Sequence, residues 1–501
     1  MATSALSNAT RRVCVIGAGA GGLALAIRLQ AAGIQTTLVE ARDQVGGAIQ
    51  AWERQGFRFD EGPAAIPDPE PLRELWSLAG RDLGDDCTLL EVSPHCRFSW
   101  PDGTCFDLSG DDGATAREIT RLAPGDLAGF EDFQRWREHA LADGFERLAQ
   151  QPQRGPLDLL RSVPLIARHQ GWRSAYGLAA HFVKNDRLRE ALAFPALLAG
   201  GNPMKAPAFT LLTHHAPRGA PLWWPEGGMS AMAQAMAALF ERLGGAVRLH
   251  DPVVQIHTLG NRAHEVETQS GWRAHFDAVA SNADLVHTYR DLLSANLRGP
   301  EQARRLAARR FSPGLFTVHF GLEGSWPGIP HRSVLMGPRY GALFADLFEH
   351  GVLPQDFVML LDHPSVTDPS LAPSGKSVFR AAIPVANLRR LPIDWETVGK
   401  LIAQRVLAEV GRRLIPDLPD RLTAVFHRSP RDHALDFNAY AGAAWSLEPS
   451  FRQSGALRPS ARDAKVPNLF LVGAGVHPGA GLPAVFAGAK AAAKLMVEST
   501  A

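Results

Sequence analysis

The chain has 501 residues, of which 46% are hydrophobic and 21% charged, and 52 Lys and Arg residues nearly balance 51 Asp and Glu residues. This length predicts two or more domains, and the charge balance argues against a nucleic-acid-binding protein. The four cysteines form no CxxC pair and no HExxH motif occurs, so we expect free thiols and no metal site.

Residues 11 to 40 are predicted to form a strand, a helix and a second strand. Val13–Ile16 is a short apolar run, Leu23–Gln30 has a helical pattern that ends near Gly33, and Thr36–Val39 predicts the second strand. Two arginines precede the first run, as in a signal peptide. The glycines at fixed offsets and the lack of a small-residue cleavage site favour a strand instead, so we expect no signal peptide.

The turn between the first strand and the helix carries Gly17, Gly19 and Gly22 in the GxGxxG spacing. Gly17 allows a tight turn, Gly19 lets a pyrophosphate approach the backbone, and Gly22 lets the helix and strand pack closely. The free N–H groups at the helix start favour phosphate binding. Glu40, at the end of the second strand, can accept hydrogen bonds from ribose hydroxyls. The arrangement predicts a dinucleotide-binding site.

A glycine pair, Gly46 and Gly47, follows the second strand and offers a second close backbone approach to a long, extended ligand. This pattern resembles the GG-doublet flavoproteins, which include amine oxidases and carotenoid desaturases, and the resemblance implies FAD as cofactor. The family usually has an arginine directly after the doublet, where this chain has Ala48. Either Arg42 takes the place of that arginine or FAD is held more weakly.

Residues 57–63 (FRFDEGP) resemble the element with which these flavoproteins carry the chain from the FAD domain towards the flavin. Residues 66–215 are predicted to be mostly helical. Within them, residues 157–183 mix aliphatic side chains, aromatic side chains and several arginines, which suits one helix lying in the headgroup region of a membrane surface. The alternative is a packed amphipathic helix with one solvated face.

Later segments are predicted to return the chain to the FAD domain. A helix is expected over Ser230–Leu243, followed by a strand that reaches Ile256. Val253 stands where such flavoproteins use the main chain of a strand to meet the adenine. Residues 279–284 (VASNAD) resemble a further returning element of the same proteins.

The stretch from 466 to 489 has no formal charge if its histidine is neutral, and its length allows a membrane span. Its glycines and prolines instead predict a strand over Leu469–Val472, a turn over Gly473–Gly481, and a helix from about Pro483. This resembles the second flavin motif of the GG-doublet proteins. The residues that the resemblance places at FAD are Gly473, Gly475, Gly481, Leu482 and Ala484.

Several motifs narrow the resemblance to one family, the bacterial phytoene desaturases. They run in order along the chain and include IRLQAAGI, GGNP, WWPEGG, SNADLVHTYRDLL, GPRY, SLEPS and VGAGVHPGAGLP. The resemblance implies an enzyme that desaturates an acyclic carotenoid, typically phytoene, with FAD as hydride acceptor. It further implies peripheral attachment to the cytoplasmic face of a membrane, no transmembrane helix, and reoxidation by oxygen or a membrane quinone.

A polyene hydrocarbon offers no charge and no hydrogen bond, so its site is expected to be a long apolar cleft. Residues 191–204 and 315–322 are candidate linings of this cleft, with ordinary core packing as the alternative. The family resemblance also marks Asp158 and Arg161 as a candidate acid–base pair. They stand three residues apart on a predicted helix, and a surface ion pair is the alternative interpretation.

Other functions remain open within this fold. The substrate is predicted to be phytoene, but a hydroxylated C40 carotenoid, a C30 chain or a carotene isomerisation are alternatives. A different class is represented by the GG-doublet chaperones that bind lipid without redox chemistry. An amine oxidase would need an aromatic cage at the flavin, and the chain has only 4 tyrosines and no aromatic pair in its C-terminal motif.

The fold class expected from these patterns is α/β. A discontinuous Rossmann-like FAD-binding domain of the amine-oxidase type is interrupted by an α+β substrate domain. The FAD-binding domain is predicted over residues 1–95, 221–299 and 456–501. The substrate domain is predicted over residues 96–220 and 300–455, with membrane association in the first of these.

Overall fold

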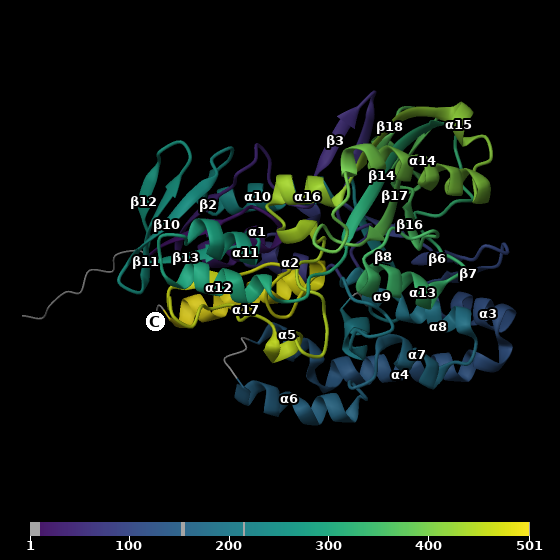
Figure 1. Cartoon of the computed structure of the whole chain (residues 1–501), viewed down its shortest axis with the longest axis horizontal. Helices are drawn as coiled ribbons and strands as arrows, with labels where there is room; N and C mark the ends of the chain where they lie inside the picture. The colour runs from purple at the N-terminus through teal and green to yellow at the C-terminus, as the bar shows by residue number, and fades with distance from the viewer. Residues whose placement is uncertain (1–10, 152–155, 214–215, 500–501) are drawn as a thin grey trace, which may run out of the picture.

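A five-stranded parallel sheet forms the centre of one half of the molecule (Figure 1). The computed structural model describes residues 11–151, 156–213 and 216–499. The strand order of this sheet is β19-β13-β1-β2-β9. The bounds are β1 (Arg12–Ile16), β2 (Gln35–Val39), β9 (Ala246–Arg248), β13 (Ala278–Ser281) and β19 (Leu469–Leu471). Strands from both ends and the middle of the chain therefore lie side by side.

Three helices pack beside this sheet: α1 (Ala20–Ala31), α10 (Met229–Arg242) and α17 (Leu482–Glu498). α1 contacts both of the others, and its residues from Gly21 to Leu29 are all buried. A helix that is apolar all round is stable only when it is covered in this way. The strand–turn–helix–strand unit, the helix near residue 230 and the strand–turn–helix near residue 470 are confirmed within one to three residues.

A small antiparallel layer lies at the outer edge of the first sheet. It consists of β10 (Val253–Leu259), β11 (Arg262–Thr268) and β12 (Arg273–His275), followed in the chain by α11 (Leu285–His287) and α12 (Arg298–Ala307). Two-stranded pairs connect the halves of the molecule: β3 (Ala51–Arg54) with β4 (Phe57–Asp60), and β5 (Leu89–Val92) with β8 (Leu222–Pro225). The short α2 (Glu70–Ser77) contacts α1 and α17.

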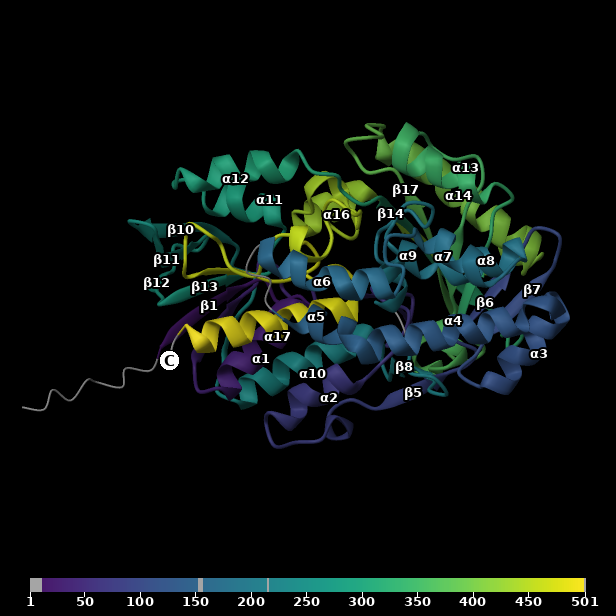
Figure 2. The ribbon, with the colours of Figure 1, turned by 90° about the horizontal axis from the view of Figure 1, so that it is seen from below.

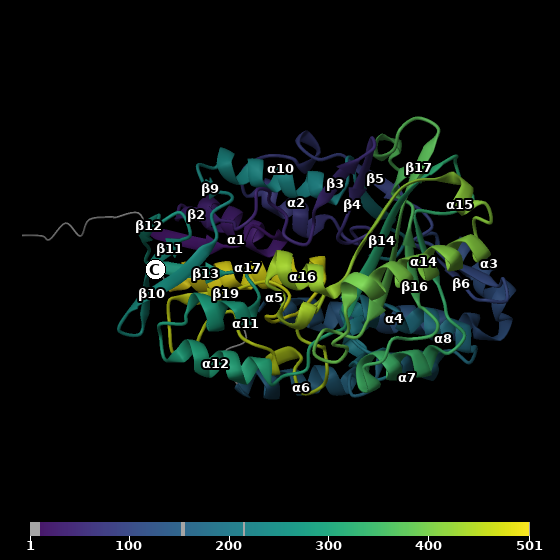
Figure 3. The same cartoon turned by 45° about the horizontal axis from the view of Figure 1, so that its top comes forward.

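The other half of the molecule is built on a seven-stranded sheet of order β18-β14-β17-β16-β15-β6-β7 (Figure 3). Its long strands β14 (Gly314–Glu323) and β17 (Lys376–Val385) are buried along nearly their whole length. The remaining strands are β6 (Cys96–Ser99), β7 (Cys105–Leu108), β15 (Arg332–Leu335), β16 (Met359–Asp362) and β18 (Leu422–Arg428). Helices α13 (Tyr340–Ala345), α14 (Trp395–Arg413), α15 (Leu418–Arg421) and α16 (Pro430–Phe437) accompany this sheet.

A helical layer lies below the seven-stranded sheet and extends beneath the first sheet (Figure 2). It comprises α3 (Asp112–Leu122), α4 (Leu127–Ala140), α5 (Glu146–Gln150), α6 (Pro156–Arg168), α7 (Ala175–Phe182), α8 (Asp186–Ala193) and α9 (Pro195–Leu198). Aromatic side chains join this layer to the sheet, and Phe194 packs edge-on against Phe98 at 5.7 Å. The seven-stranded sheet and this helical layer are therefore the two walls between which the predicted substrate cleft would lie.

One expectation about this region is confirmed and one is wrong. Residues 66–215 are mostly helical, and they also supply the short strands β5, β6 and β7. Residues 157–183 do not form one helix, since α6 ends at Arg168, the following Gln170 has a φ of +54°, and α7 begins after the N-cap Ser174. α7 is buried against α4, so only α6 keeps an exposed face. The five-part division of the chain into two domains stays a prediction.

Candidate active site

A cavity of about 870 Å³ opens at the carboxyl ends of β1, β2 and β13 and continues towards the seven-stranded sheet. Ligands of open α/β sheets bind at this edge, because the loops there face the crevice between neighbouring strands. Eleven of the thirteen residues predicted to bind FAD line the cavity: Gly17, Gly19, Glu40, Arg42, Gly46, Gly47, Val253, Gly473, Gly475, Gly481 and Leu482.

The first glycine turn leaves room only for a backbone. Gly17 has a φ of +94°. A Cβ added to Gly19 would lie 2.9 Å from the Asn282 Nδ2, and one added to Gly21 would lie 2.6 Å from the Asn282 Oδ1. Side chains are thus excluded on the side where α1 begins, so its unpaired N–H groups remain open to phosphate oxygens. These residues fit the pyrophosphate of a dinucleotide.

Glu40 is held in place by the same turn. Its Oε2 accepts a hydrogen bond from the Ala18 N–H at 2.7 Å, and its Oε1 accepts one from the Arg42 N–H at 3.0 Å. Burial raises the pKa of Glu40, while these hydrogen bonds and the charge of Arg42 oppose the increase. Each oxygen keeps a lone pair for a ribose hydroxyl, and the ribose-binding role of Glu40 stays a prediction.

The glycine doublet packs directly onto the first turn. Gly46 donates its N–H to the Ala18 carbonyl at 2.8 Å, and a Cβ on Gly47 would lie 3.0 Å from the Gly19 Cα. Ala48 lines the cavity where the family has an arginine. The Arg42 guanidinium lies 5.4 Å from the centre of the Phe437 ring, and Arg42 also lines the cavity. The structure therefore places Arg42 at the cavity, and its role in place of the missing arginine stays a prediction.

The two remaining FAD predictions fall outside this lining. Gly22 faces the first turn, and a Cβ there would lie 2.0 Å from the Gly17 carbonyl oxygen, so Gly22 is required for packing. Ala484 is buried on α17 and lines a second cavity of about 950 Å³. The helix start at Leu482 supplies free N–H groups to the first cavity, which suits a ligand that gains negative charge.

The cavity wall contains a buried ionic cluster, which was not predicted from the sequence. The Arg428 Nε lies 3.2 Å from Glu61 Oε2, and the His433 Nε2 lies 3.7 Å from Glu61 Oε1. Burial raises the pKa of Glu61, but the nearby His433 and the charge of Arg428 outweigh burial and lower it to about 2. Glu61 is therefore a carboxylate, next to the doublet, at any physiological pH.

A second buried pair supports the same wall. Arg380 donates to the Asp362 carboxylate from Nε at 2.9 Å and from Nη2 at 2.7 Å, and its Nη1 donates to the Gly62 carbonyl at 2.7 Å. This fixes the loop after β4 against the seven-stranded sheet. The signal available in the sequence for Glu61 was its place in the FRFDEGP run, beside the glycine and proline that end it.

The remainder of the cavity is an arm between the sheet and the helical layer, with a mainly apolar lining. The segment 191–204 contributes Ala191, Leu192, Phe194, Pro195 and Leu198, and the segment 315–322 contributes Leu315. Both segments were predicted to line the substrate cleft. The arm and the glycine cradle belong to one cavity, so a ligand in the arm can reach a dinucleotide in the cradle.

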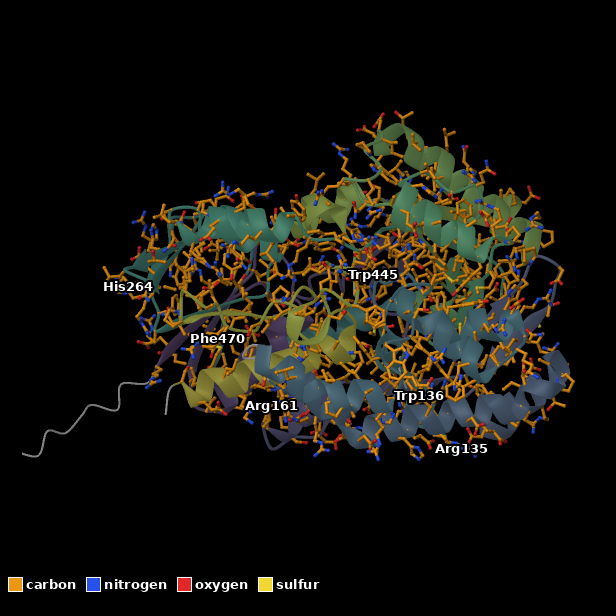
Figure 4. The ribbon with its side chains drawn as sticks, turned by 60° about the horizontal axis from the view of Figure 1, so that its bottom comes forward. Arg135, Trp136, Arg161, His264, Trp445 and Phe470 are labelled. Atoms are coloured by element: carbon orange, nitrogen blue, oxygen red, sulfur yellow. The ribbon has the colours of Figure 1, made fainter. Side chains whose placement is uncertain are left out.

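Asp158 and Arg161 lie elsewhere. They form an ion pair on α6, with 3.1 Å between Asp158 Oδ1 and Arg161 Nη1, and the Arg161 side chain is 79% exposed (Figure 4). The structure places neither residue in the lining of the two cavities described above. The pair shares the predicted helix face, but its acid–base role stays a prediction.

The described residues contain no group of three or more His, Cys, Asp or Glu side chains arranged to hold a metal ion. All four cysteines are free thiols. Among the same residues, no helix combines the length and apolar character needed to cross a bilayer.

Comparison with known proteins gives consistent matches over the full chain. The pattern of flavin containing amine oxidoreductases matches residues 20–497. A lycopene-forming phytoene desaturase of a Paracoccus species is 42% identical over 99% of both chains, and one from Pantoea ananas is 42% identical over 97% of this chain and 98% of its own. Among solved structures, a Methanosarcina mazei oxidoreductase (TM-score 0.65, 16% identity, 98% and 100% covered) and cyclohexylamine oxidase from Brevibacterium oxydans (TM-score 0.63, 18% identity, 98% and 100% covered) share the fold.

Proposed function

The chain belongs to the flavin-containing amine oxidoreductases and, within them, to the phytoene desaturases, and from this premise we propose that it desaturates phytoene in carotenoid biosynthesis. FAD is its cofactor and, when bound, accepts a hydride from the substrate. The observation that carries the proposal is the single cavity that joins the glycine cradle to an apolar arm.

The residues of the chain supply binding, exclusion of water and electrostatic support. The arm offers Leu192, Phe194 and Leu198 to a hydrocarbon chain, which gains its binding energy from apolar burial. Dry walls also strengthen the field of charged groups near the reacting carbon. The Glu61 carboxylate lies in this wall and stabilises positive charge that develops on the substrate when hydride leaves.

Support for attachment to a membrane surface comes from α6 and the loop after it. Leu160, Val163 and Trp172 are 66%, 50% and 58% exposed, and the Arg161 and Arg168 side chains accompany them. Exposed apolar residues beside arginines suit the headgroup region of a bilayer. The second cavity is partly lined by α6 and shares wall residues with the first, namely Pro217, Arg218, Ala480 and Pro483.

We place this surface on the cytoplasmic face, as a peripheral contact, with the second cavity as the route by which a membrane-dissolved substrate enters. Oxygen or a membrane quinone accepts the electrons in this scheme. A quinone reaches the protein through the same bilayer, so added quinone raises turnover in liposomes under anaerobic conditions if it is the acceptor.

The membrane contact predicts that Leu160→Glu combined with Val163→Glu reduces binding to liposomes by roughly tenfold, because two charges enter the apolar contact. Co-sedimentation with vesicles measures the bound fraction. Leu259→Glu is the matched control, since Leu259 is 71% exposed on β10, away from α6. Equal loss in the control, or no loss in the double variant, contradicts the assignment.

The acid–base role predicted for Asp158 is tested separately from the membrane contact. Asp158→Asn lowers turnover by roughly 100-fold at unchanged FAD content, because an amide cannot take up the proton. Asp132→Asn is the matched control, since Asp132 pairs with Arg135 in the same i,i+3 arrangement on an exposed helix face. Unchanged turnover of Asp158→Asn assigns the pair to the protein surface.

Incubation of the FAD-loaded protein with phytoene in liposomes tests the proposed function. The expected product absorbs at longer wavelength than phytoene, because each new double bond extends the conjugated system. Double-bond rearrangement without a loss of hydrogen would indicate an isomerase. A purified protein without a flavin spectrum would indicate a lipid-binding chaperone.

A further inference from the structure

Two guanidinium groups face the same apolar cavity without a carboxylate partner. The end of the cavity where β6, β15 and α4 meet is lined by His95, Gln134, Arg137 and Arg332, here called the arginine end. Within the described residues, neither Arg137 nor Arg332 forms an ion pair or a side-chain hydrogen bond. Unpaired cations in such a place are costly unless a ligand or water compensates them.

α4 presents two of these residues. Phe130, Gln134 and Arg137 are spaced on one helical face, and all three line the cavity. The Arg137 Nε and the Gln134 Oε1 are buried and have no hydrogen-bond partner among the described residues. Burial lowers the pKa of Arg137 to about 10, so the guanidinium is still charged at neutral pH. A buried donor without a hydrogen-bond partner costs free energy, so we expect a bound group to accept from it.

The opposite wall adds a second cation and a neutral histidine. Arg332 begins β15, and its charge acts on His95 together with that of Arg137. Burial, followed by these two charges, lowers the pKa of His95 to about 4. The ring is therefore neutral, with Nε2 donating to the Ala220 carbonyl at 2.9 Å. The neutral histidine therefore adds no charge to the arginine end.

A third arginine in the cavity lining, Arg218, does have carboxylate partners. The Arg218 Nε lies 2.6 Å from Asp112 Oδ2, and its Nη1 lies 3.6 Å from Glu138 Oε1. Both acids are thus engaged by Arg218. Around Arg137 and Arg332 the lining includes Phe98, Leu108 and Phe130. The carboxylates that neighbour the two arginines are bound by other arginines, Asp112 and Glu138 by Arg218 and Asp362 by Arg380.

The arginine end is also separate from the ionic cluster at Glu61. In the register of the sheet, Arg332 pairs with Asp362 on β16, and Asp362 pairs with Arg380 on β17. The Asp362 side chain is bound by Arg380, whose Nη1 holds Gly62. Arg332 therefore lies two strands away from the loop beside the glycine doublet. A group bound at the arginine end would set the substrate at a fixed position relative to that loop.

We propose that the arginine end is a subsite for an anionic oxygen group at the terminus of an acyclic polyene, a carboxylate above all, bound by Arg137 and Arg332 with Gln134. This inference rests on the proposed function and extends its ligand class to polyenes with an anionic end group, which phytoene lacks. A planar carboxylate matches the fork of a guanidinium, and the polyene behind it fills the apolar arm. The shared chemistry, an anion at the cavity wall, is also offered by an anionic lipid headgroup.

The test compares two probes on the FAD-loaded protein: an acyclic apo-lycopenoic acid and its methyl ester, both in detergent micelles. Quenching of tryptophan fluorescence by the polyene measures each dissociation constant. The wild type is expected to bind the acid about tenfold or more tightly than the ester. Arg137→Leu is expected to abolish this preference and leave the affinity for the ester unchanged, while Arg137→Lys retains part of it.

Arg135→Leu is the matched control. Arg135 lies on the same helix, but it is 57% exposed and paired with Asp132 (Figure 4). The control is expected to keep the full preference for the acid. Equal affinity of the wild type for acid and ester, or an equal effect of Arg135→Leu and Arg137→Leu, overturns the proposal.

Two further arms separate the remaining outcomes. Vesicles with and without phosphatidylglycerol are compared for wild type and Arg137→Leu. A loss confined to phosphatidylglycerol vesicles, with no preference for the acid, assigns the arginine end to a lipid headgroup and overturns the substrate proposal. Flavin reduction by phytoene is followed in the same preparations. Reduction without an acid preference refutes the subsite alone, whereas the absence of both reduction and polyene binding refutes the proposed function as well.

Discussion

Gly46→Ala is expected to yield a folded protein that binds FAD roughly 10- to 100-fold more weakly, because two local constraints forbid a side chain there. Gly46 has a φ of +113°, and an added Cβ would lie 2.0 Å from the Ile49 carbonyl oxygen. The turn must open to relieve this overlap, which moves Gly47 away from Gly19. The ratio of flavin to protein absorbance after gel filtration measures the loss, and circular dichroism checks the fold.

Gly33→Ala separates the steric effect from the cost of the backbone conformation. Gly33 also has a positive φ, of +80°, but nothing lies within 4 Å of an added Cβ. The control is expected to lose about 1 kcal/mol of stability and to keep its FAD. Full FAD content in Gly46→Ala would contradict the role given to the doublet.

Glu61→Gln is expected to lower the free energy of unfolding by about 3 kcal/mol at neutral pH, the magnitude typical of removing one partner from a buried ion pair. The substitution removes the carboxylate beside the His433 ring and one of the two carboxylates of Arg428, which keeps Asp436. Urea unfolding of the FAD-loaded proteins gives the difference. Glu396→Gln is the control, because Glu396 pairs with Arg431 while 76% exposed, and its loss should leave stability unchanged within error.

The pH dependence of this difference has a definite sign. The pKa of Glu61 falls from its ordinary 4.5 to about 2 on folding, so the native state holds the proton less tightly than the unfolded state. Its stabilising contribution is complete above 4.5 and disappears as the pH falls towards 2. The difference between wild type and Glu61→Gln should therefore shrink from about pH 7 to about pH 3. A difference that stays constant would show that Glu61 is not ionised in the folded protein.

Local patterns account for the part of the site that the sequence predicted. Gly17, Gly19 and Glu40 stand within one strand–turn–helix–strand unit, so their spacing alone predicts which atoms would meet a pyrophosphate and a ribose. The same holds for Gly473 and Gly481 in the C-terminal turn. Gly22 was assigned to the correct turn, and its packing against Gly17 is the role that the spacing implies.

Contacts between distant segments account for what was missed. Arg428 lies more than 360 residues beyond Glu61, and no periodicity in either segment indicates that β18 brings the two together. β6 and β7 were not predicted for the same reason, since they join a sheet whose other strands come from the distant residues 314–428. Nothing in the sequence singles out Arg137 and Arg332, because only the folded chain brings α4 and β15 to one cavity.

Anaerobic mixing of the FAD-loaded protein with phytoene in liposomes tests the central claim most directly. The flavin spectrum should bleach as hydride is taken from the substrate, and one new double bond should form in the polyene for each flavin reduced. A flavin that stays oxidised while phytoene is bound would contradict the assignment of the protein as an FAD-dependent carotenoid desaturase.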